Sequence, residues 1–264
     1  MNTAYPFAAG YLLLGGHVDP IFIIGSLFFL IPYNILMYGI NDVFDYESDI
    51  RNPRKGSIEG AVESKQFHPF IIKASLISTI PFVIVLAFMI PWYALITLIG
   101  VLFFVVAYSI KGLRFKEIPF IDSITSSLHF VGPLVVALAI FGFPQVAWPF
   151  VAAFFLWGMA SHAFGAVQDI IPDRKGHLAS IATVLGARST VGVSFLLYLL
   201  SSIILAEKGH NVFVAVIGLL YVLNVLPYLR VTDETSQKTN KGWRRFIWIN
   251  YAAGAMITLS LIFI

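Results

Sequence analysis

Nine apolar stretches, separated by short polar or Gly/Pro-containing breaks, constrain how this chain folds. A helix needs about 20 mostly apolar residues to cross the hydrocarbon core of a bilayer. The hydrophobic fraction of 58% is far above that of soluble domains. The expected spans are residues 3–17, 20–42, 69–90, 91–110, 120–142, 146–168, 189–206, 211–230 and 244–264. We therefore expect an all-α, polytopic membrane protein, with a bundle of nine transmembrane helices in a single domain over residues 1–264.

Lysine and arginine are distributed asymmetrically between the connections. Sixteen of the 17 follow the second, fourth, sixth and eighth spans, and Lys208 lies on the other side. Because basic connections stay on the cytoplasmic side, we expect the N-terminus inside and the C-terminus outside the cell (plasma) membrane. The net charge of +3 then reflects this topology, and it does not imply a nucleic-acid partner.

Two acidic motifs lie at the ends of apolar stretches expected to reach the cytoplasmic side. They are Asn41-Asp42-x-x-Asp45-x-x-x-Asp49 and Asp169-x-x-x-Asp173. On a helix that advances about 100° per residue, Asn41, Asp45 and Asp49 share one face, with Asp42 beside them. A carboxylate at the bilayer centre costs about 2.5–3.5 kcal/mol, and neighbouring buried carboxylates repel one another unless a cation neutralises them. The motifs therefore imply bound cations.

The second motif is expected to continue the sixth span. Helical geometry places His162, Asp169 and Asp173 on one face, although Pro172 lacks a backbone N–H and allows Asp173 to lie on a turn instead. Asp45 and Asp169 are 124 residues apart, as are Asp49 and Asp173. An ancient duplication and a coincidence explain this spacing equally well.

Oxygen donors without cysteine suit a hard cation such as Mg²⁺, which is typically held by one or two carboxylates, waters and substrate phosphate oxygens. A diphosphate substrate follows from this preference. Basic side chains near the acids are candidates to bind its oxygens, although cytoplasmic connections are basic for topological reasons as well. The candidate diphosphate-binding residues are Asn41, Arg54, Lys111, Arg114, Lys116 and Arg174.

The run from Asn41 to Asp49, Asn-Asp-Val-Phe-Asp-Tyr-Glu-Ser-Asp, resembles the first aspartate motif of the UbiA-type intramembrane prenyltransferases. Asp169-Ile170-Ile171-Pro172-Asp173 resembles their second. The runs Arg51-Asn52-Pro53-Arg54-Lys55-Gly56, Leu113-Arg114-Phe115-Lys116-Glu117 and Gly165-Ala166-Val167-Gln168-Asp169 are most similar to the lycopene elongase branch, whose members add five-carbon prenyl units to a carotenoid.

This resemblance implies a central cavity open to the cytoplasm, in which Mg²⁺ assists departure of diphosphate from dimethylallyl diphosphate. An electron-rich carbon of the acceptor then attacks the allylic cation. The implied metal ligands are Asp42, Asp45, Asp49, Asp169 and Asp173. Asn41, Asp45 and Asp169 are implied to be catalytic, and the implied partners are an isoprenyl diphosphate and a hydrophobic acceptor within the lipid bilayer.

His162 is a candidate base for the end of the reaction, with a structural interhelical hydrogen bond as the alternative. Quinone-pathway members of the family carry Asp at the position of His162 and Tyr-Ala at that of Gly165-Ala166, which disfavours a phenolic acceptor here. Asp122, at the start of the fifth span, is a further candidate acid, with a charge that stabilises the helix N-terminus as the favoured interpretation.

Two other functions remain open from the sequence. The first is prenylation of an aromatic quinone precursor or another lipid acceptor. The second is cation transport, since intramembrane carboxylates also mark ion paths. The acids gather at expected helix ends beside basic residues rather than at mid-membrane, which favours the enzyme.

Overall fold

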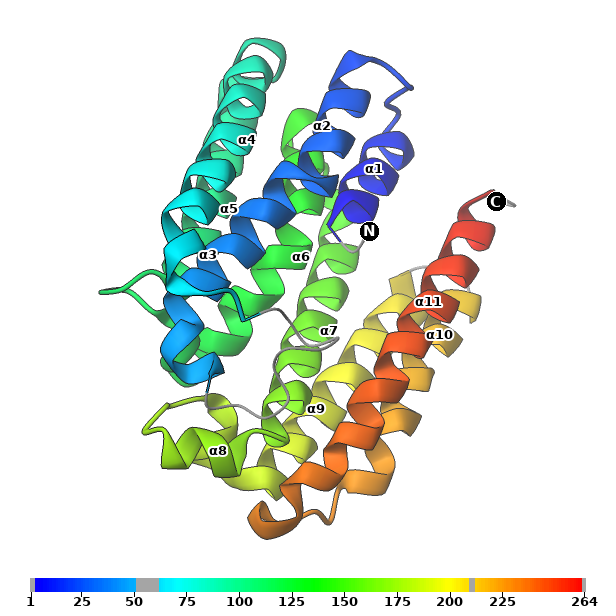
Figure 1. Cartoon of the computed structure of the whole chain (residues 1–264). Coiled ribbons are helices and arrows are strands. Elements are labelled where there is room, and N and C mark those ends of the chain that lie inside the picture. Colours follow the sequence, from blue (N-terminus) through cyan, green and yellow to red (C-terminus); the bar gives the residue numbers. More distant parts are fainter. Residues whose placement is uncertain (1–2, 51–61, 209–211, 263–264) are drawn as a thin grey trace. The chain divides into compact units, whose positions relative to one another are not determined.

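The computed structural model describes residues 3–50, 62–208 and 212–262, and its regular elements in these ranges are all helical (Figure 1). The chain divides into two compact units. Unit 1 comprises Met1–Phe115 and Leu128–Gln145, and unit 2 comprises Lys116–Ser127 and Val146–Ile264. Helix α6 (Ile121–Ile140) therefore contributes residues to both.

Unit 1 contains the helices of the first half of the chain. They are α1 (Ala4–Leu13), α2 (Pro20–Leu30), α3 (Pro32–Asp49), α4 (His68–Met89), α5 (Trp92–Ser109) and the later part of α6. Unit 2 contains α7 (Trp148–Val167), α8 (Ile170–Lys175), α9 (Ile181–Lys208), α10 (Val212–Val225) and α11 (Asn240–Ile262), after the first turns of α6.

A break between α2 and α3 divides the span expected at residues 20–42. Pro32 has no N–H to continue the hydrogen bonding of α2. At this break the side chain of Asn34 hydrogen-bonds to the last carbonyls of α2, because its Nδ2 donates to Phe29 O at 2.8 Å and to Leu30 O at 3.0 Å. Helix α3 then continues past residue 42 to Asp49, so that the first acidic motif is helical as predicted.

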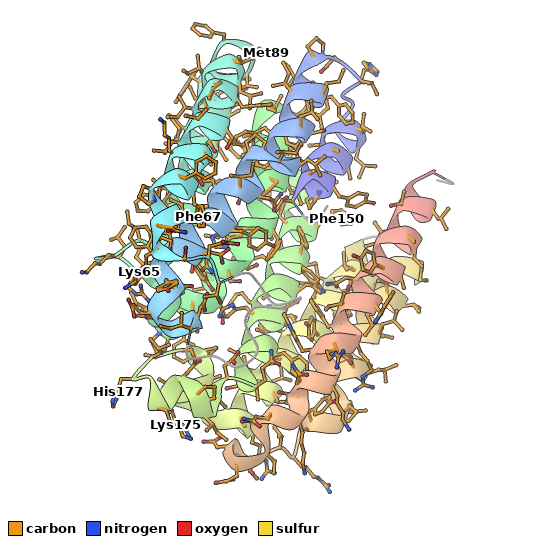
Figure 2. The ribbon with its side chains drawn as sticks, in the orientation of Figure 1. Lys65, Phe67, Met89, Phe150, Lys175 and His177 are labelled. Atoms are coloured by element: carbon orange, nitrogen blue, oxygen red, sulfur yellow. The ribbon has the colours of Figure 1, made fainter. Side chains whose placement is uncertain are left out.

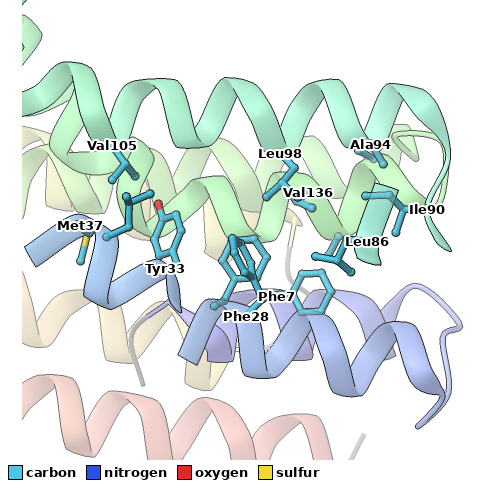
Figure 3. Packing of buried hydrophobic residues seen from close by; sticks show 14 of the residues in the cluster. Phe7, Phe28, Tyr33, Met37, Leu86, Ile90, Ala94, Leu98, Val105 and Val136 are labelled. Carbon is cyan, nitrogen blue, oxygen red and sulfur yellow. The ribbon is translucent and has the colours of Figure 1, made fainter. Parts of the chain in front are cut away.

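Aromatic and aliphatic side chains fill the core of unit 1 (Figure 3). Phe7 of α1, Phe28 of α2, Tyr33 of α3 and Leu98 of α5 are each at most 1% exposed. The Tyr33 hydroxyl donates to the His129 carbonyl at 2.9 Å. In lipid, where apolar burial gives little driving force, this close packing and such interhelical hydrogen bonds hold helices together.

A glycine lets α3 approach α4. A Cβ atom added at Gly39 would lie 2.8 Å from Ser75 Oγ and 3.0 Å from Ile71 Cγ2. The Ser75 hydroxyl is within reach of two acceptors, the carbonyls of Ile71 at 2.9 Å and of Ile35 at 3.2 Å. Small residues at helix contacts are typical of membrane bundles, and this one fixes the helix that carries the first motif.

Unit 2 is built around α7 and α9. Gly165 of α7 packs against the Trp243 ring, to which an added Cβ would come within 2.9 Å. Helix α9 has a kink at Gly186, whose φ of 76° and ψ of 166° lie in a region essentially restricted to glycine. The carboxylate of Asp233 lies beside this kink, with Oδ1 accepting the Ala187 N–H at 2.6 Å.

Six helical segments of the described residues are long and apolar enough to cross a membrane. They are Pro20–Glu47, Lys65–Met89, Trp92–Ser109, Ile121–Ile140, Gln145–Val167 and Ile181–Glu207. At the other three expected spans the chain is also helical, but α1 and α10 have 10 and 14 residues, and α11 has 23. The chain is thus an all-helical integral membrane protein, and the expected number of nine spans stays a prediction.

The surfaces of these helices are strongly apolar. Phe88 is 88% exposed, and Trp92 and Phe70 are 72% and 70% exposed. Along the segment Lys65–Met89, the charged Lys65 lies at one end, in the 3-10 turn before α4, and Met89 lies at the other end (Figure 2). Exposed large hydrophobic side chains on this scale are suited to contact with lipid.

Replacing Gly39 by Leu should lower the unfolding temperature in detergent by several degrees, because the side chain has no space between α3 and α4. Gly100→Leu is the matched control, since a Cβ at Gly100 meets nothing within 4 Å. Scanning fluorimetry measures both. Equal unfolding temperatures for the two variants would contradict the close approach of α3 and α4.

Candidate functional site

The first acidic motif occupies the last turns of α3. The carboxylates of Asp45 and Asp49 are buried, at 6% and 8% exposure, while Asn41 and Asp42 are partly exposed. The Ser109 hydroxyl at the end of α5 donates to Asn41 Oδ1 at 3.0 Å. Ser109 was not singled out from the sequence, because nothing in the chain indicates which residue faces Asn41 across 68 positions.

Arg114 lies beside this motif, as the sequence suggested. Its Nη1 donates to the Phe44 carbonyl at 3.2 Å, and its Nη2 is 3.9 Å from Asp45 Oδ1. A turn after α5 carries it there, with Gly112 at a φ of 101° and Arg114 itself at 42°. A positive φ is uncommon outside glycine and costs roughly 1–3 kcal/mol, and such residues gather at functional sites.

The second motif differs from the continuous helix that was expected. Helix α7 ends at Val167, Asp169 caps the short helix α8, and Asp173 lies inside α8. The prediction that Asp169 and Asp173 continue one face from His162 is therefore wrong. Pro172 lies in the first turn of α8, where no intrahelical N–H bond is needed, so it neither ends a helix nor places Asp173 on a turn.

Gln168 stabilises the break between α7 and α8. It is buried, its Nε2 donates to Gly165 O at 3.0 Å, and its Oε1 accepts from Asn240 Nδ2 at 2.7 Å. One side-chain amide thus satisfies a carbonyl near the end of α7 and connects it to the start of α11. The contact lies at the point where α7 ends, five residues before Pro172.

The candidate diphosphate-binding cations lie in different surroundings. Lys111 is exposed in the turn after α5, and Arg54 lies outside the described residues. Lys116 is half-buried in a short 3-10 helix (Phe115–Glu117), and burial lowers its pKa to about 8, opposed by the charges of Glu117 and Asp173. Its ammonium is therefore easier to deprotonate than that of an exposed lysine.

Arg174 contacts protein groups within unit 2. Its Nη1 donates to Asp233 Oδ2 at 2.6 Å, and its Nε and Nη2 donate to Thr183 O at 3.2 and 2.8 Å. The Ala187 N–H, and after it Arg174, hold the pKa of Asp233 below its usual value. Arg174 therefore braces α8 against the kink of α9, and its role toward diphosphate stays a prediction. Lys175 and His177 extend from the same end of the unit (Figure 2).

His162 lies on α7 beside a carboxylate. Its Nε2 is 3.6 Å from Asp122 Oδ2, and Asp122 is fully buried at the start of α6. Asp122 does more than place a charge at the start of its own helix, because Oδ2 also accepts the N–H of Ile181, the first residue of α9, at 2.7 Å. The sequence offers no signal that joins positions 122, 162 and 181.

A family model described as the UbiA prenyltransferase family matches residues 3–250 of the chain. The match runs through both units and both acidic motifs. The chain belongs to the UbiA prenyltransferase family. This membership supports the enzyme interpretation over cation transport.

Curated and solved members of the family extend the comparison. A lycopene elongase/hydratase from Corynebacterium glutamicum is 49% identical over 265 residues, covering 99% of this chain and 92% of that protein. A C50 β-cyclic carotenoid biosynthesis protein from Dietzia is 47% identical over 98% of this chain and 61% of that protein. A UbiA homolog from Archaeoglobus fulgidus, solved with DMAPP and Mg²⁺, has a TM-score of 0.64 at 19% identity, covering 96% of this chain and 94% of that one. This last similarity shows that the fold is the UbiA fold.

The UbiA motif residues offer donors suited to Mg²⁺. Asp45 and Asp49 provide buried carboxylate oxygens on one helix, with the amide of Asn41 one turn earlier. Among the described residues no three His, Cys, Asp or Glu side chains form a group able to hold a metal by themselves. An ion that takes few protein ligands and completes its shell with waters and phosphate oxygens fits this donor set.

Replacing Asp233 by Ala should lower the unfolding temperature by roughly 1–8 °C, because loss of the Ala187 N–H acceptor resembles loss of a helix cap, which costs about 0.5–2 kcal/mol. Asp233→Asn, which keeps the acceptor for the Ala187 N–H, should retain part of that stability. Thermal unfolding in detergent distinguishes the two variants. An unchanged unfolding temperature for Asp233→Ala would show that this contact does not stabilise the kink.

Proposed function

We propose that this UbiA-family chain transfers a dimethylallyl group from its diphosphate to the end of lycopene or a related carotenoid. The observation that carries the proposal is the 49% identity over nearly the whole chain with a lycopene elongase/hydratase. The carotenoid biosynthesis protein from Dietzia, at 47% identity, supports a carotenoid acceptor as well. The presence of His162 where quinone-pathway members carry Asp agrees with an acceptor that has no phenol.

Both acidic motifs act on the diphosphate in this proposal. Asp42, Asp45 and Asp49 in unit 1, and Asp169 and Asp173 in unit 2, hold Mg²⁺. Bound Mg²⁺ neutralises the charge that develops on the leaving diphosphate. Asn41 and Arg114 orient the diphosphate beside the first motif, and Lys116 contributes charge beside the second.

The carbon chemistry needs a dry site rather than further protein ligands. The bond between the allylic carbon and the diphosphate oxygen breaks, and the terminal double bond of the acceptor supplies the electron pair for the new carbon–carbon bond. The resulting tertiary cation ends by losing a proton or by adding water. Apolar and aromatic walls prevent water from capturing the first cation too early.

The membrane location suits the acceptor. A linear carotenoid is about as long as the roughly 30 Å hydrocarbon core, so only its end has to enter the site from the lipid. We propose nine spans, with the diphosphate end of the site facing the cytoplasm, where the basic connections lie.

Purified protein given Mg²⁺ and dimethylallyl diphosphate should extend lycopene by five-carbon units and leave hydroxybenzoate unchanged. Chromatography with mass detection follows both acceptors. A prenylated product from hydroxybenzoate alone would replace the proposed acceptor with an aromatic quinone precursor.

Asp45→Ala and Asp169→Ala should each lower turnover by orders of magnitude while the protein stays folded, because removing one carboxylate from an acidic group relieves repulsion but weakens metal binding. Chelating Mg²⁺ from the wild type should have the same effect and be reversed by adding it back. Asp19→Asn, at a helix cap in unit 1, is the control. Full activity in either motif variant would exclude its role as a metal ligand.

The KM for the donor should rise as the pH increases through about 8, because Lys116 then loses the charge that attracts diphosphate. An ordinary lysine, whose pKa is about 10.4, keeps its charge over this range. Lys116→Arg keeps the charge and should flatten the profile between pH 7 and 9.5. If the two profiles are the same, Lys116 does not bind the donor.

A further inference from the structure

A pocket of about 470 Å³ lies within unit 2, where the kink of α9 at Gly186 meets the connection from α10 to α11. Its two walls are residues 185–189 of α9 and residues 230–234 of the connection. The hydrogen bond from the Ala187 N–H to Asp233 Oδ1 joins these walls. The contact that holds the kink thus also fixes the two walls relative to each other.

Each wall contributes one arginine to the pocket. Arg188 follows the kink on α9, and Arg230 lies in the turn after the 3-10 helix Leu226–Tyr228. Both residues are exposed, and no other residue in the described part of the chain forms a hydrogen bond or an ion pair with either guanidinium. A guanidinium carries five N–H donors and no acceptor, so both groups can donate to a bound anion.

The two acids that line the pocket are already engaged by protein groups. Asp233 accepts the Ala187 N–H through Oδ1 and the Arg174 Nη1 through Oδ2, each at 2.6 Å. The Thr232 hydroxyl, and after it the backbone N–H of Glu234 itself, hold the pKa of Glu234 below its usual value. Because Arg174 balances Asp233, two arginines face one remaining carboxylate. This excess of one positive charge matches an anion with a single charge, such as a phosphodiester.

The pocket lies where apolar helices end. Its α9 wall belongs to the first turns of Ile181–Glu207, which is long and apolar enough to cross a membrane. Its other wall follows the shorter apolar helix Val216–Tyr228 by two residues, at Arg230. Leu223 and Leu226 on that helix are 60% and 47% exposed. Arginines beside exposed apolar helix ends lie at the level of lipid headgroups, and basic pockets between membrane helices bind such headgroups.

We propose that this pocket binds the phosphodiester of an anionic phospholipid. Arg188 and Arg230 donate to its oxygens, because the paired N–H groups of a guanidinium match the spacing of phosphate oxygens. The acyl chains lie along the exposed apolar surface of unit 2. The bound headgroup connects α9 to the segment after α10, beside the Asp233 contact through which Arg174 braces α8. This inference concerns binding alone and does not depend on the acceptor of the reaction.

Lipid binding is tested on the full chain in neutral detergent, without any substrate. Native mass spectrometry counts retained lipids, and thermal unfolding reports their effect on stability. Phosphatidylglycerol should leave one tightly bound molecule per chain and raise the unfolding temperature, because a ligand of the folded state stabilises it. Phosphatidylcholine should do neither, since its choline cancels the charge of its phosphate. Equal retention of the two lipids would overturn the proposal.

The arginines are tested next. Arg188→Gln and Arg230→Gln should each weaken phosphatidylglycerol binding about tenfold, because each removes charge-assisted hydrogen bonds. Both variants should unfold at the wild-type temperature without lipid, since neither guanidinium has a partner among the described residues. Arg230→Lys should bind with intermediate affinity, because it keeps the charge but loses the paired donors. Wild-type affinity in both glutamine variants would exclude this site.

Arg244→Gln is the matched control for general surface charge. Arg244 is also exposed and also follows the eighth expected span, but it does not line the pocket. This variant should bind phosphatidylglycerol within twofold of the wild type. A loss as large as that in Arg188→Gln would show that the lipid is attracted by the basic surface as a whole, and the proposed site would be wrong.

Inorganic phosphate distinguishes a lipid headgroup from a soluble anion. It should neither raise the unfolding temperature nor displace phosphatidylglycerol, because it has no acyl chains to add to the contact with the arginines. Stabilisation by phosphate that is lost in Arg188→Gln, without stabilisation by phosphatidylglycerol, would overturn the lipid proposal and assign the pocket to a soluble phosphate.

Discussion

Lipid offers no hydrogen bonds, so each interruption of a helix in this chain must find its own polar partner. Asn34 supplies hydrogen-bond donors where the helix is interrupted at Pro32, between α2 and α3. Gln168 accepts and donates at the break between α7 and α8, and Asp233 accepts an N–H at the kink of α9. The break between α7 and α8 places Asp169 at a helix cap, and the first motif occupies the last turns of α3. The arrangement of the site thus depends on side chains that form hydrogen bonds with backbone N–H and C=O groups at the helix breaks.

The carboxylates of the two motifs are carried by different local structures. The first is one continuous helical face, where Asp45 and Asp49 are buried and Arg114 approaches from a strained turn. The second spans a break, with Asp169 at a cap and Asp173 within the next helix. If the motifs arose by duplication, their local structures have since diverged. Their common property is an oxygen-rich helix end, which is what a hard cation shared with a diphosphate requires.

Much of the fold could be predicted from the sequence, because hydropathy and spacing report local structure. The helical character, the membrane location and the helical first motif follow from short-range patterns. The contact of Gln168 with Asn240 at the break before Pro172 could not be predicted, since the two residues are 72 positions apart. The partner of Arg174 and the second role of Asp122 were missed for the same reason. Residues that are distant along the chain come into contact only when the helices pack, and a single sequence does not show which of them do so.

The hydrogen bond from Ile181 to Asp122 has a consequence for how the protein is made. The carboxylate emerges from the ribosome 59 residues before the amide that it binds. At about 5–20 residues per second, synthesis of that interval takes roughly 3–12 s. During this time the buried carboxylate at the start of α6 lacks one of its final donors, and it gains that donor only once the first residue of α9 has been made.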